Sequence, residues 1–394
     1  MSKPRIAIII SHPIQHFCPQ YVSLAKKEDI VIKVFFASAL GYKKYIDPNF
    51  KQEISWANLN LDRFDHVFLN GDDVIASDKY LDAPNLNNEL DQYKPHLVIV
   101  HGYFQKYQRR AYQWAKKNNV KIAYGSDSEL RHKRNILKEA LKYFFIKHYF
   151  SSINYFLSVG NANEEYYQHY GVSTKKIIRM HFSIDIDFYK ECFLKKKQLR
   201  KGIRQQYGIQ DSEIALAVVG KLVDWKSQDH IIEAMQLLEQ KGLILQLFII
   251  GSGTMQEAWE QKSAALKKSK VHFTGFVKPE QLPGFYAATD IYVHPAAIEP
   301  HSLAISEAIY MGCPIIISDR CGSYGATDDV QIGKNGYVFR FGNINDLATQ
   351  IELLVKNSEA RSRFGEYSHT IAVEFQKRSH GYFMNQLSTY LVEI

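Results

Sequence analysis

The sequence predicts an α/β fold in which two doubly wound parallel sheets face a common cleft. Short β-branched runs alternate with longer amphipathic stretches, a pattern that is typical of parallel strands covered by helices. A charged segment at residues 191–204 interrupts this alternation, which then begins again. With 394 residues, the chain is too long for one ordinary hydrophobic core and suits two domains.

The first half predicts one domain at residues 1–190. Short β-branched runs predict its strands at residues 5–10, 30–36, 66–69, 97–100, 121–124 and 155–159. The amphipathic stretches between several of these runs predict helices at residues 18–27, 105–118 and 136–149.

The second half predicts another domain of the same kind at residues 205–370. Its strands are expected at residues 214–219, 245–250, 270–274, 291–294, 314–317 and 336–339. Residues 191–204 are expected to form a linker or a surface helix between the domains. Residues 371–394 are amphipathic, and we expect them to form a helix that crosses back onto the first domain.

The charge of the chain is unevenly distributed. Residues 1–200 contain 31 Lys and Arg against 20 Asp and Glu, whereas residues 201–394 contain 18 against 21. A basic first half predicts an anionic partner, such as a membrane surface, a lipid phosphate or a charged glycan. Nucleic acid is not expected, because nothing in the sequence resembles a nucleic-acid-binding module.

Three features predict a cytoplasmic protein. The cysteines are few and scattered, without CxxC spacing, which is typical of reduced thiols: Cys18, Cys192, Cys313 and Cys321. No apolar run reaches the roughly 18 residues that span a bilayer. The opening residues lead directly into an apolar strand and lack a signal-peptide cleavage pattern.

Residues 131–150 combine basic side chains with an aromatic face. As a helix, this segment has the features of one that lies at the inner face of the cytoplasmic membrane. It also fits a surface helix whose aromatic residues pack into the core while the lysines and arginines stay solvated. Both interpretations stay open.

Residues 290–314 contain the first candidate site. A strand ends near His294, Glu299 follows in a loop, and a helix begins near Ser302 and ends before Gly312. The backbone N–H groups at the start of such a helix bind phosphate, because they lack partners within the helix and lie at the positive end of its dipole. Glu299 and Glu307 flank that position. On spacing alone, a helix with one exposed glutamate and a loop with another are the simpler explanation.

Two glycine turns supply further candidates. Gly220 follows a strand and precedes Lys221 and Lys226, whose ammonium groups can neutralise a diphosphate leaving group. Gly251 and Gly253 form a turn after another buried strand, but such turns close many βα units. Taken separately, solvated lysines and ordinary turns remain the simpler explanation.

Taken together and in order, these motifs carry a family resemblance. They are Gly220-Lys221 with Lys226, Gly251-Ser252-Gly253, Gly275-Phe276-Val277, Glu299-x7-Glu307 and Gly333-x-x-Gly336. Over residues of about 214 to 355, this order resembles the second domain of family 4 glycosyltransferases. The resemblance implies the GT-B fold, with two Rossmann-like domains that face a cleft, and a retaining, nucleotide-sugar-dependent reaction. Residues 11–21 and 318–323 are similar to a bacterial branch that builds surface polysaccharides.

The resemblance also implies roles for individual residues. Lys221 and Lys226 would hold the donor diphosphate, Glu307 the ribose and Glu299 the transferred sugar. The N–H groups of Ser302 and Leu303 would receive the distal phosphate, and His301 would lie beside them on the donor side. Val277 would lie beside the base, with Gly220, Gly251 and Gly253 in the donor turns. No metal and no cofactor are expected beyond the nucleotide-sugar substrate.

Several positions depart from the family pattern and leave the donor open. Lys221 stands where Arg is usual, Ser227 where Gly is usual, and His301-Ser302 where Phe-Gly is usual. Residues 12–16 replace the paired glycines that are common in the first loop. A sugar-nucleotide epimerase of the same fold and a degenerate relative that only binds glycan or nucleotide therefore remain alternatives.

Polar residues at the strand ends of the first half are candidates for the acceptor side. They are His12, Gln15, His16, His101, Tyr103 and Asp127. Asp127 or His101 would hold the acceptor hydroxyl or take its proton. A metal at His12 and His16 is not expected, because no third ligand has suitable spacing. Asp185 and Asp187 form a DxD string, which we interpret as structural because it lies far from the donor motifs.

Overall fold

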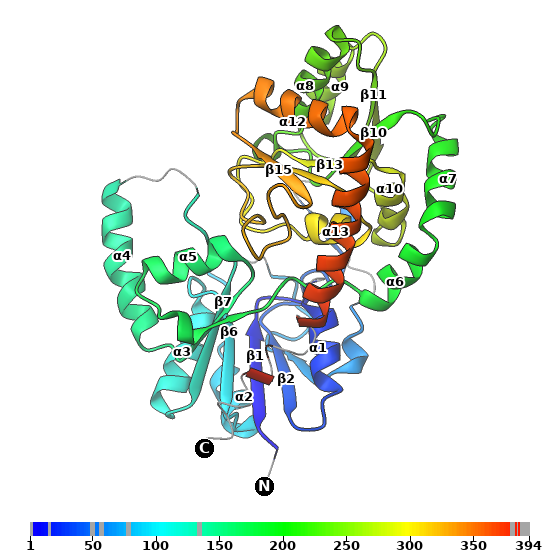
Figure 1. Ribbon diagram of the computed structural model, residues 1–394. Helices are drawn as coiled ribbons and strands as arrows, with labels where there is room; N and C mark the ends of the chain where they lie inside the picture. Colours follow the sequence, from blue (N-terminus) through cyan, green and yellow to red (C-terminus); the bar gives the residue numbers. More distant parts are fainter. Residues whose placement is uncertain are drawn as a thin grey trace.

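The computed structural model describes residues 3–14, 17–47, 52–54, 59–75, 80–131, 136–378, 383 and 385–386. Each half of the chain forms an α/β domain, and the last long helix runs from the second domain toward the first (Figure 1). The predicted fold class is therefore confirmed.

The first domain is built on a parallel sheet in the order β5-β2-β1-β6-β7-β8-β9. Its strands are β1 Arg5–Ile10, β2 Val31–Phe36, β5 His66–Phe68, β6 Leu97–His101, β7 Lys121–Ser126, β8 Tyr155–Ser158 and β9 Ile177–Arg179. The helices are α1 Cys18–Ala25, α2 Leu86–Tyr93, α3 Lys106–Lys117, α4 Ile136–Ser151 and α5 Asn161–His169. A small antiparallel pair, β3 Tyr45–Asp47 and β4 Gln52–Ile54, lies outside this sheet.

The second domain is built on a parallel sheet in the order β12-β11-β10-β13-β14-β15. Its strands are β10 Ile214–Val219, β11 Leu245–Ile250, β12 Lys270–Gly275, β13 Ile291–His294, β14 Ile315–Ser318 and β15 Gly336–Phe339. The helices are α7 Lys196–Gln206, α8 Asp229–Gln240, α9 Gln256–Ser263, α10 Leu282–Ala288, α11 Leu303–Tyr310, α12 Ile344–Lys356 and α13 Ser358–Lys377.

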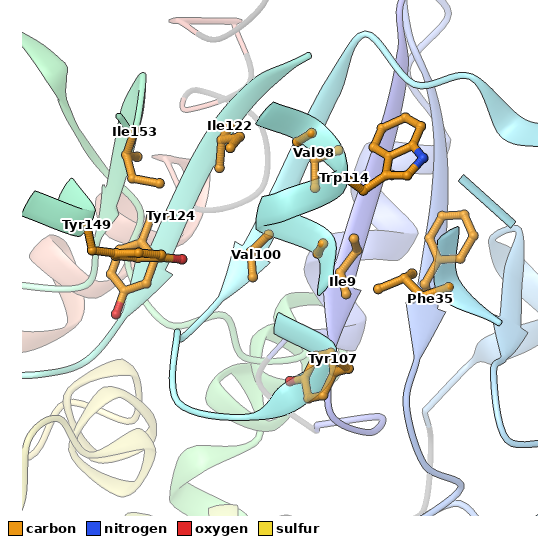
Figure 2. Close-up of a cluster of buried hydrophobic side chains, with 14 of the residues drawn as sticks. Ile9, Phe35, Val98, Val100, Tyr107, Trp114, Ile122, Tyr124, Tyr149 and Ile153 are labelled. Carbon is orange, nitrogen blue, oxygen red and sulfur yellow. The ribbon is translucent and has the colours of Figure 1, made fainter. Parts of the chain in front are cut away.

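Both sheets are buried on two faces, which explains why their central strands are almost continuously apolar. In the first domain, Ile9, Val98 and Val100 of the sheet pack beneath Tyr107 and Trp114 of α3 (Figure 2). Each such side chain contributes about 1.5–3 kcal/mol when it is fully buried. Tyr124 and Tyr149 extend this cluster toward α4 (Figure 2).

The two domains are connected twice. The segment predicted as a linker or surface helix lies within α6 Ile186–Leu194 and α7. After α13, Phe383 is buried in the core of the first domain, and Lys27 Nζ donates to Asn385 Oδ1 at 2.8 Å. Gln376 ties the two connections together, because it donates to the carbonyl of Phe182 at 2.9 Å and accepts from the N–H of Ile184 at 3.0 Å.

Three turns at the carboxyl edge of the second sheet are bonded to one another. The N–H of Gly220 donates to the carbonyl of Ile250 at 3.0 Å, and the N–H of Gly251 donates to the carbonyl of Gly275 at 2.9 Å. A Cβ at Gly251 would lie 2.0 Å from the carbonyl oxygen of Gly220, and one at Gly253 would lie 2.3 Å from that of Leu222. These glycines therefore allow backbone segments to pack directly against each other.

The predicted strands of both sheets are observed, with ends that differ by at most two residues. The unpredicted strands are β3, β4 and β9, each of three residues. Within the described part of the chain, no helix has the length and apolar character needed to cross a bilayer.

We expect Gly253→Ala to destabilise the second domain by about 1–3 kcal/mol, because its new methyl group cannot avoid the backbone of Leu222. Urea unfolding followed by circular dichroism measures this change. Gly202→Ala is the matched control, since no atom lies within 4 Å of a Cβ placed there. Equal midpoints for Gly253→Ala and wild type would contradict the packing role.

Candidate active site

The strand order of each sheet reverses at one position, and these two positions define the site. In the first domain the reversal lies between β1 and β6, and in the second it lies between β10 and β13. Ligands of open α/β sheets bind at such positions, beyond the carboxyl ends of the strands. Most of the residues predicted from the sequence follow these four strands, whereas Asp127 follows β7, Gly251 and Gly253 follow β11, and Val277 follows β12.

An ion pair spans the reversal in the second domain. Lys226, from the turn after β10, contacts Glu299, from the loop after β13, and His294 Nε2 lies 3.1 Å from the same carboxylate. Burial alone would raise the pKa of Glu299, but the hydrogen bond from His294 and the charge of Lys226 outweigh it and lower the pKa to about 2. Glu299 is therefore ionised throughout the physiological range.

Two further donor-side predictions lie at the same edge of the sheet. Lys221 follows Gly220 directly in the turn after β10 and is half-buried. Val277 follows β12 and packs against the core of the second domain. The backbone of Val277 thus lies at the same sheet edge, two strands away from the turn of Lys221.

The start of α11 lies beside this ion pair. The N–H of Ser302, the residue before the helix, donates to Ser323 Oγ at 2.9 Å. A phosphate that uses this N–H must therefore displace the hydroxyl of Ser323. Leu303 is the first residue of the helix, so its N–H points out of the same end.

His301 is buried between the two domains. Its Nε2 lies 3.3 Å from Asp329 Oδ2, and its ring packs edge-on against Phe182 of the first domain, with ring centroids 4.8 Å apart. Burial alone lowers the pKa of His301, but the carboxylate of Asp329 outweighs it and raises the pKa. Asp329 therefore favours the protonated, positively charged form of His301 next to the start of α11.

Glu307 lies on α11 and lines a small cavity of about 80 Å³. Tyr286 donates to its Oε2 at 2.8 Å. Burial raises the pKa of Glu307 to about 7, and the hydrogen bond from Tyr286 offsets only part of this effect. The carboxyl group is thus partly protonated at neutral pH.

The same cavity overturns one expectation about the DxD string. Asp185 accepts from the N–H of Phe188 at 3.1 Å and so caps α6, in agreement with a structural role. However, Asp185 also lines the cavity of Glu307, so the expectation that it lies far from the donor motifs is wrong. The reason is that the chain crosses between the domains at this point.

The first domain contributes a larger cavity of about 260 Å³ at its own strand reversal. Its lining includes Ser11, Phe17, His101, Gln105, Gln108, Asp127 and Phe182. Burial lowers the pKa of His101 to about 4 and raises the pKa of Asp127. His301 and Glu299 both influence the pKa of Asp127, which places this residue opposite the donor side of the second domain.

The remaining acceptor-side predictions have different surroundings. His12 Nδ1 lies 2.9 Å from Ser11 Oγ, and burial lowers the pKa of His12 to about 4. The ring of Tyr103 lies in an aromatic cluster, and its centroid is 5.7 Å from that of Tyr149 and 6.2 Å from that of Phe145. Gln15 and His16 lie outside the described residues.

Sequence reasoning missed several residues of this region. His294 carried a usable signal, because it ends a predicted strand at the reversal of the sheet. No sequence signal indicated three other residues, because each lies in a segment without a motif or reaches the site through contacts with distant residues: Asp329, Phe182 and Gln108.

Comparison with known proteins adds the following. Residues 200–370 match the family model described as glycosyl transferases group 1. Spore coat protein SA of Bacillus subtilis is 30% identical over 181 residues, which are 44% of this chain and 47% of the relative. Alpha-D-kanosaminyltransferase of Streptomyces kanamyceticus is 28% identical over 168 residues, or 42% of each protein. The chain thus spans less than half the length of these curated relatives.

A solved structure is similar over the whole chain. The crystal structure of Anabaena HepE in complex with UDP has a TM-score of 0.69 at 15% identity and covers 100% of both chains. At this identity the likeness concerns the fold, which is the GT-B arrangement of two facing Rossmann-like domains.

The two glutamates of the site are expected to affect stability in opposite directions. The pKa of Glu307 is raised from 4.5 to about 7. The wild-type protein therefore loses stability as the pH rises through this range, and a neutral glutamine avoids the loss. Glu307→Gln should raise the unfolding free energy by about 1–2 kcal/mol at pH 8 and by little at pH 5.

Glu299→Gln is the matched variant, because the pKa of Glu299 is lowered from 4.5 to about 2. Its stabilising effect is present above pH 4.5 and is lost as the pH falls through the folded pKa. At pH 8 the substitution should lower the unfolding free energy by about 1–3 kcal/mol. Urea unfolding at both pH values measures both variants. Changes of the same sign at pH 8 would contradict this assignment.

Proposed function

Because residues 200–370 match the family model of the group 1 glycosyl transferases, we propose that this protein transfers a sugar from a nucleotide-sugar donor to an acceptor hydroxyl. The observation that carries the proposal is the cluster of Lys226, Glu299 and His294 at the strand reversal of the second domain, next to the start of α11. This cluster combines a cation for a leaving group with a carboxylate for sugar hydroxyls.

The donor binds along the carboxyl edge of the second sheet. The nucleoside lies between Glu307, which accepts the ribose hydroxyls, and the backbone of Val277. The diphosphate lies at the start of α11, where the N–H groups of Ser302 and Leu303 meet its distal phosphate. Ionised Glu307 accepts these hydroxyls best, so the bound ribose favours the ionised form of a group whose pKa is about 7.

The leaving group is a nucleoside diphosphate, and Lys226 and Lys221 neutralise the charge that develops on it. Before the donor arrives, Lys226 pairs with Glu299. When the diphosphate takes over Lys226, Glu299 becomes available to the hydroxyls of the transferred sugar. The two ammonium groups supply the positive charge, and we propose that the reaction needs no metal.

The acceptor hydroxyl enters through the cavity of the first domain. His101 is neutral at neutral pH, because its pKa is about 4, and it therefore offers a hydrogen bond to the hydroxyl. Burial raises the pKa of Asp127, which makes its carboxylate a better proton acceptor than that of an ordinary aspartate. We propose that Asp127 takes the proton as the new bond forms, with retention at the sugar carbon.

The class of donor and acceptor is the finer part of the proposal. The UDP complex of HepE supports a uridine nucleotide. A glycan or lipid-linked acceptor in bacterial polysaccharide or glycoconjugate biosynthesis fits the basic first half of the chain. An epimerase would instead convert the donor with no acceptor present, and a binding scaffold would bind nucleotide without turnover.

We also propose that α4 contacts the membrane on which a lipid-linked acceptor would lie. Phe104 is 62% exposed, and on α4 Leu141 is 77%, Phe144 71% and Phe145 58% exposed. The helix lies at the outer edge of the first domain (Figure 1), and Lys147 and His148 are exposed beside these apolar side chains. Exposed aromatic residues next to basic ones suit the interface of an anionic bilayer.

The transfer reaction is tested with Lys226→Ala. A thermal-shift screen of UDP, GDP, ADP, CMP and dTDP first identifies the nucleotide, and the matching nucleotide sugars then serve as donors. Lys226→Ala should lower kcat by about 100- to 1000-fold, because an ammonium group at the leaving group stabilises mainly the transition state. Lys241→Ala, which removes a surface lysine paired with Glu352 at 2.6 Å, should leave kcat unchanged.

The same assay separates the alternatives. Wild-type turnover that persists in EDTA is expected, and a loss that Mn²⁺ restores would overturn the metal-free mechanism. Donor conversion without an acceptor would identify an epimerase. A kcat for Lys226→Ala within about twofold of wild type would remove the leaving-group role.

Membrane contact is tested with Leu141→Ser. Loss of this exposed side chain should reduce co-sedimentation with phosphatidylglycerol vesicles by about fivefold, because the apolar surface it buries in the bilayer is lost. Leu353→Ser is the control, since Leu353 is 50% exposed on α12 of the second domain. Equal binding by the two variants would assign α4 a purely structural role.

A further inference from the structure

A loop of the second domain meets the start of a helix of the first domain. The N–H of Asn161, the first residue of α5, donates to Asp328 Oδ2 at 2.7 Å. In the other direction, the N–H of Thr327 donates to Asn161 Oδ1 at 3.0 Å. Each domain thus satisfies a backbone donor of the other.

Helix α5 has no cap from its own sequence. The position before the helix is Gly160, which has no side chain to accept a hydrogen bond. Such positions usually carry Ser, Thr, Asp or Asn, because the first N–H groups of a helix have no partners within it. Asp328 supplies the missing carboxylate from the other domain, where it also meets the positive end of the helix dipole.

The contact requires a glycine on each side. A Cβ at Gly160 would lie 2.5 Å from Asp328 Oδ1, and a Cβ at Gly325 would lie 2.3 Å from Asn161 Oδ1. Asp328 itself is fully buried. The two domains therefore approach more closely here than any larger residue would allow.

Arg179 of the first domain completes the contact. Its Nη1 donates to the carbonyl of Thr327 at 3.0 Å and lies 3.7 Å from Asp328 Oδ1, while its Nε donates to Glu164 at 2.8 Å. The buried carboxylate of Asp328 thus has a cation from the first domain beside it. Without the first domain, the carboxylate of Asp328 would lack the nearby guanidinium of Arg179.

The next residue of the loop leads to the active site. Asp329 accepts from Ser306 Oγ of α11 at 2.8 Å and lies 3.3 Å from His301 Nε2. Since Asp328 and Asp329 are adjacent, the docking of one on α5 fixes the position of the other beside His301.

We propose that Asp328 is a positioning residue that caps α5 from the second domain and so holds the domains in the arrangement in which His301 packs against Phe182 of the first-domain cavity. The effect of Asp328 on turnover rests on the proposed glycosyl transfer. The cap itself is independent of that function and is measurable without any substrate.

Hydrogen exchange in the ligand-free protein tests the cap. Gly160→Ala keeps every charge and places a methyl group against Asp328, so exchange of the amides at residues 161–163 should become about fivefold faster. Asp328→Ala should have a similar effect. In the Asp328→Ala background, Gly160→Ala should add almost nothing, because the group that it displaces is gone. Exchange in β11 should not change in any variant.

Each result decides the matter. Two results would overturn the proposal. One is an exchange rate that does not change in Gly160→Ala. The other is a double variant in which the fold-changes in exchange rate of Gly160→Ala and Asp328→Ala multiply. Gly202→Ala, which has open space at its Cβ, controls for the substitution itself. If glycosyl transfer is detected, Gly160→Ala should lower kcat about fivefold with unchanged affinity for UDP, because the nucleotide contacts lie in the second domain. A changed exchange rate without detectable transfer would preserve the cap and refute only the proposed function.

Discussion

The ion pair of Lys226 and Glu299 is the interaction on which the donor side depends. The two residues come from strands β10 and β13, which are neighbours only because the strand order of the sheet reverses there. In the partly buried space at the sheet edge, each would otherwise be a poorly solvated charge. The pair lowers the pKa of Glu299 and holds both side chains in place, so the site already contains the charges that the proposed donor would meet.

The fold was largely predictable because the central strands are buried on both faces. Strands such as β10 and β11 are almost entirely apolar, so their limits were evident from the sequence. Strand β9 lies at the edge of the first sheet, has only three residues and follows two lysines. No long run of apolar residues therefore indicated a strand there. Short edge strands are formed by pairing with a neighbour, and a local pattern contains little information about such pairing.

The site was predictable only in part. Motif spacing predicted that Lys226, Glu299 and Glu307 lie near the carboxyl edge of the second sheet, because each follows a strand or lies in a helix that the pattern already defined. The same reasoning assigned Gly251 and Gly253 to ligand binding, whereas the structure also gives them a packing role against the turn of Gly220 and Leu222. The spacing of residues within a motif does not predict contacts between residues far apart in the chain, such as the contact of Asn161 with Asp328.

The double connection between the domains limits how they can move. The two crossing segments lie side by side, because Gln376 is bonded to both Phe182 and Ile184. One connecting segment would allow the domains to twist, slide and bend relative to each other. Two adjacent connecting segments mainly allow one domain to rotate relative to the other about the line that joins the segments. Motion of this kind changes the separation of the opposing faces while preserving their alignment, so the strand ends of the two sheets return to the same relative position each time the domains approach.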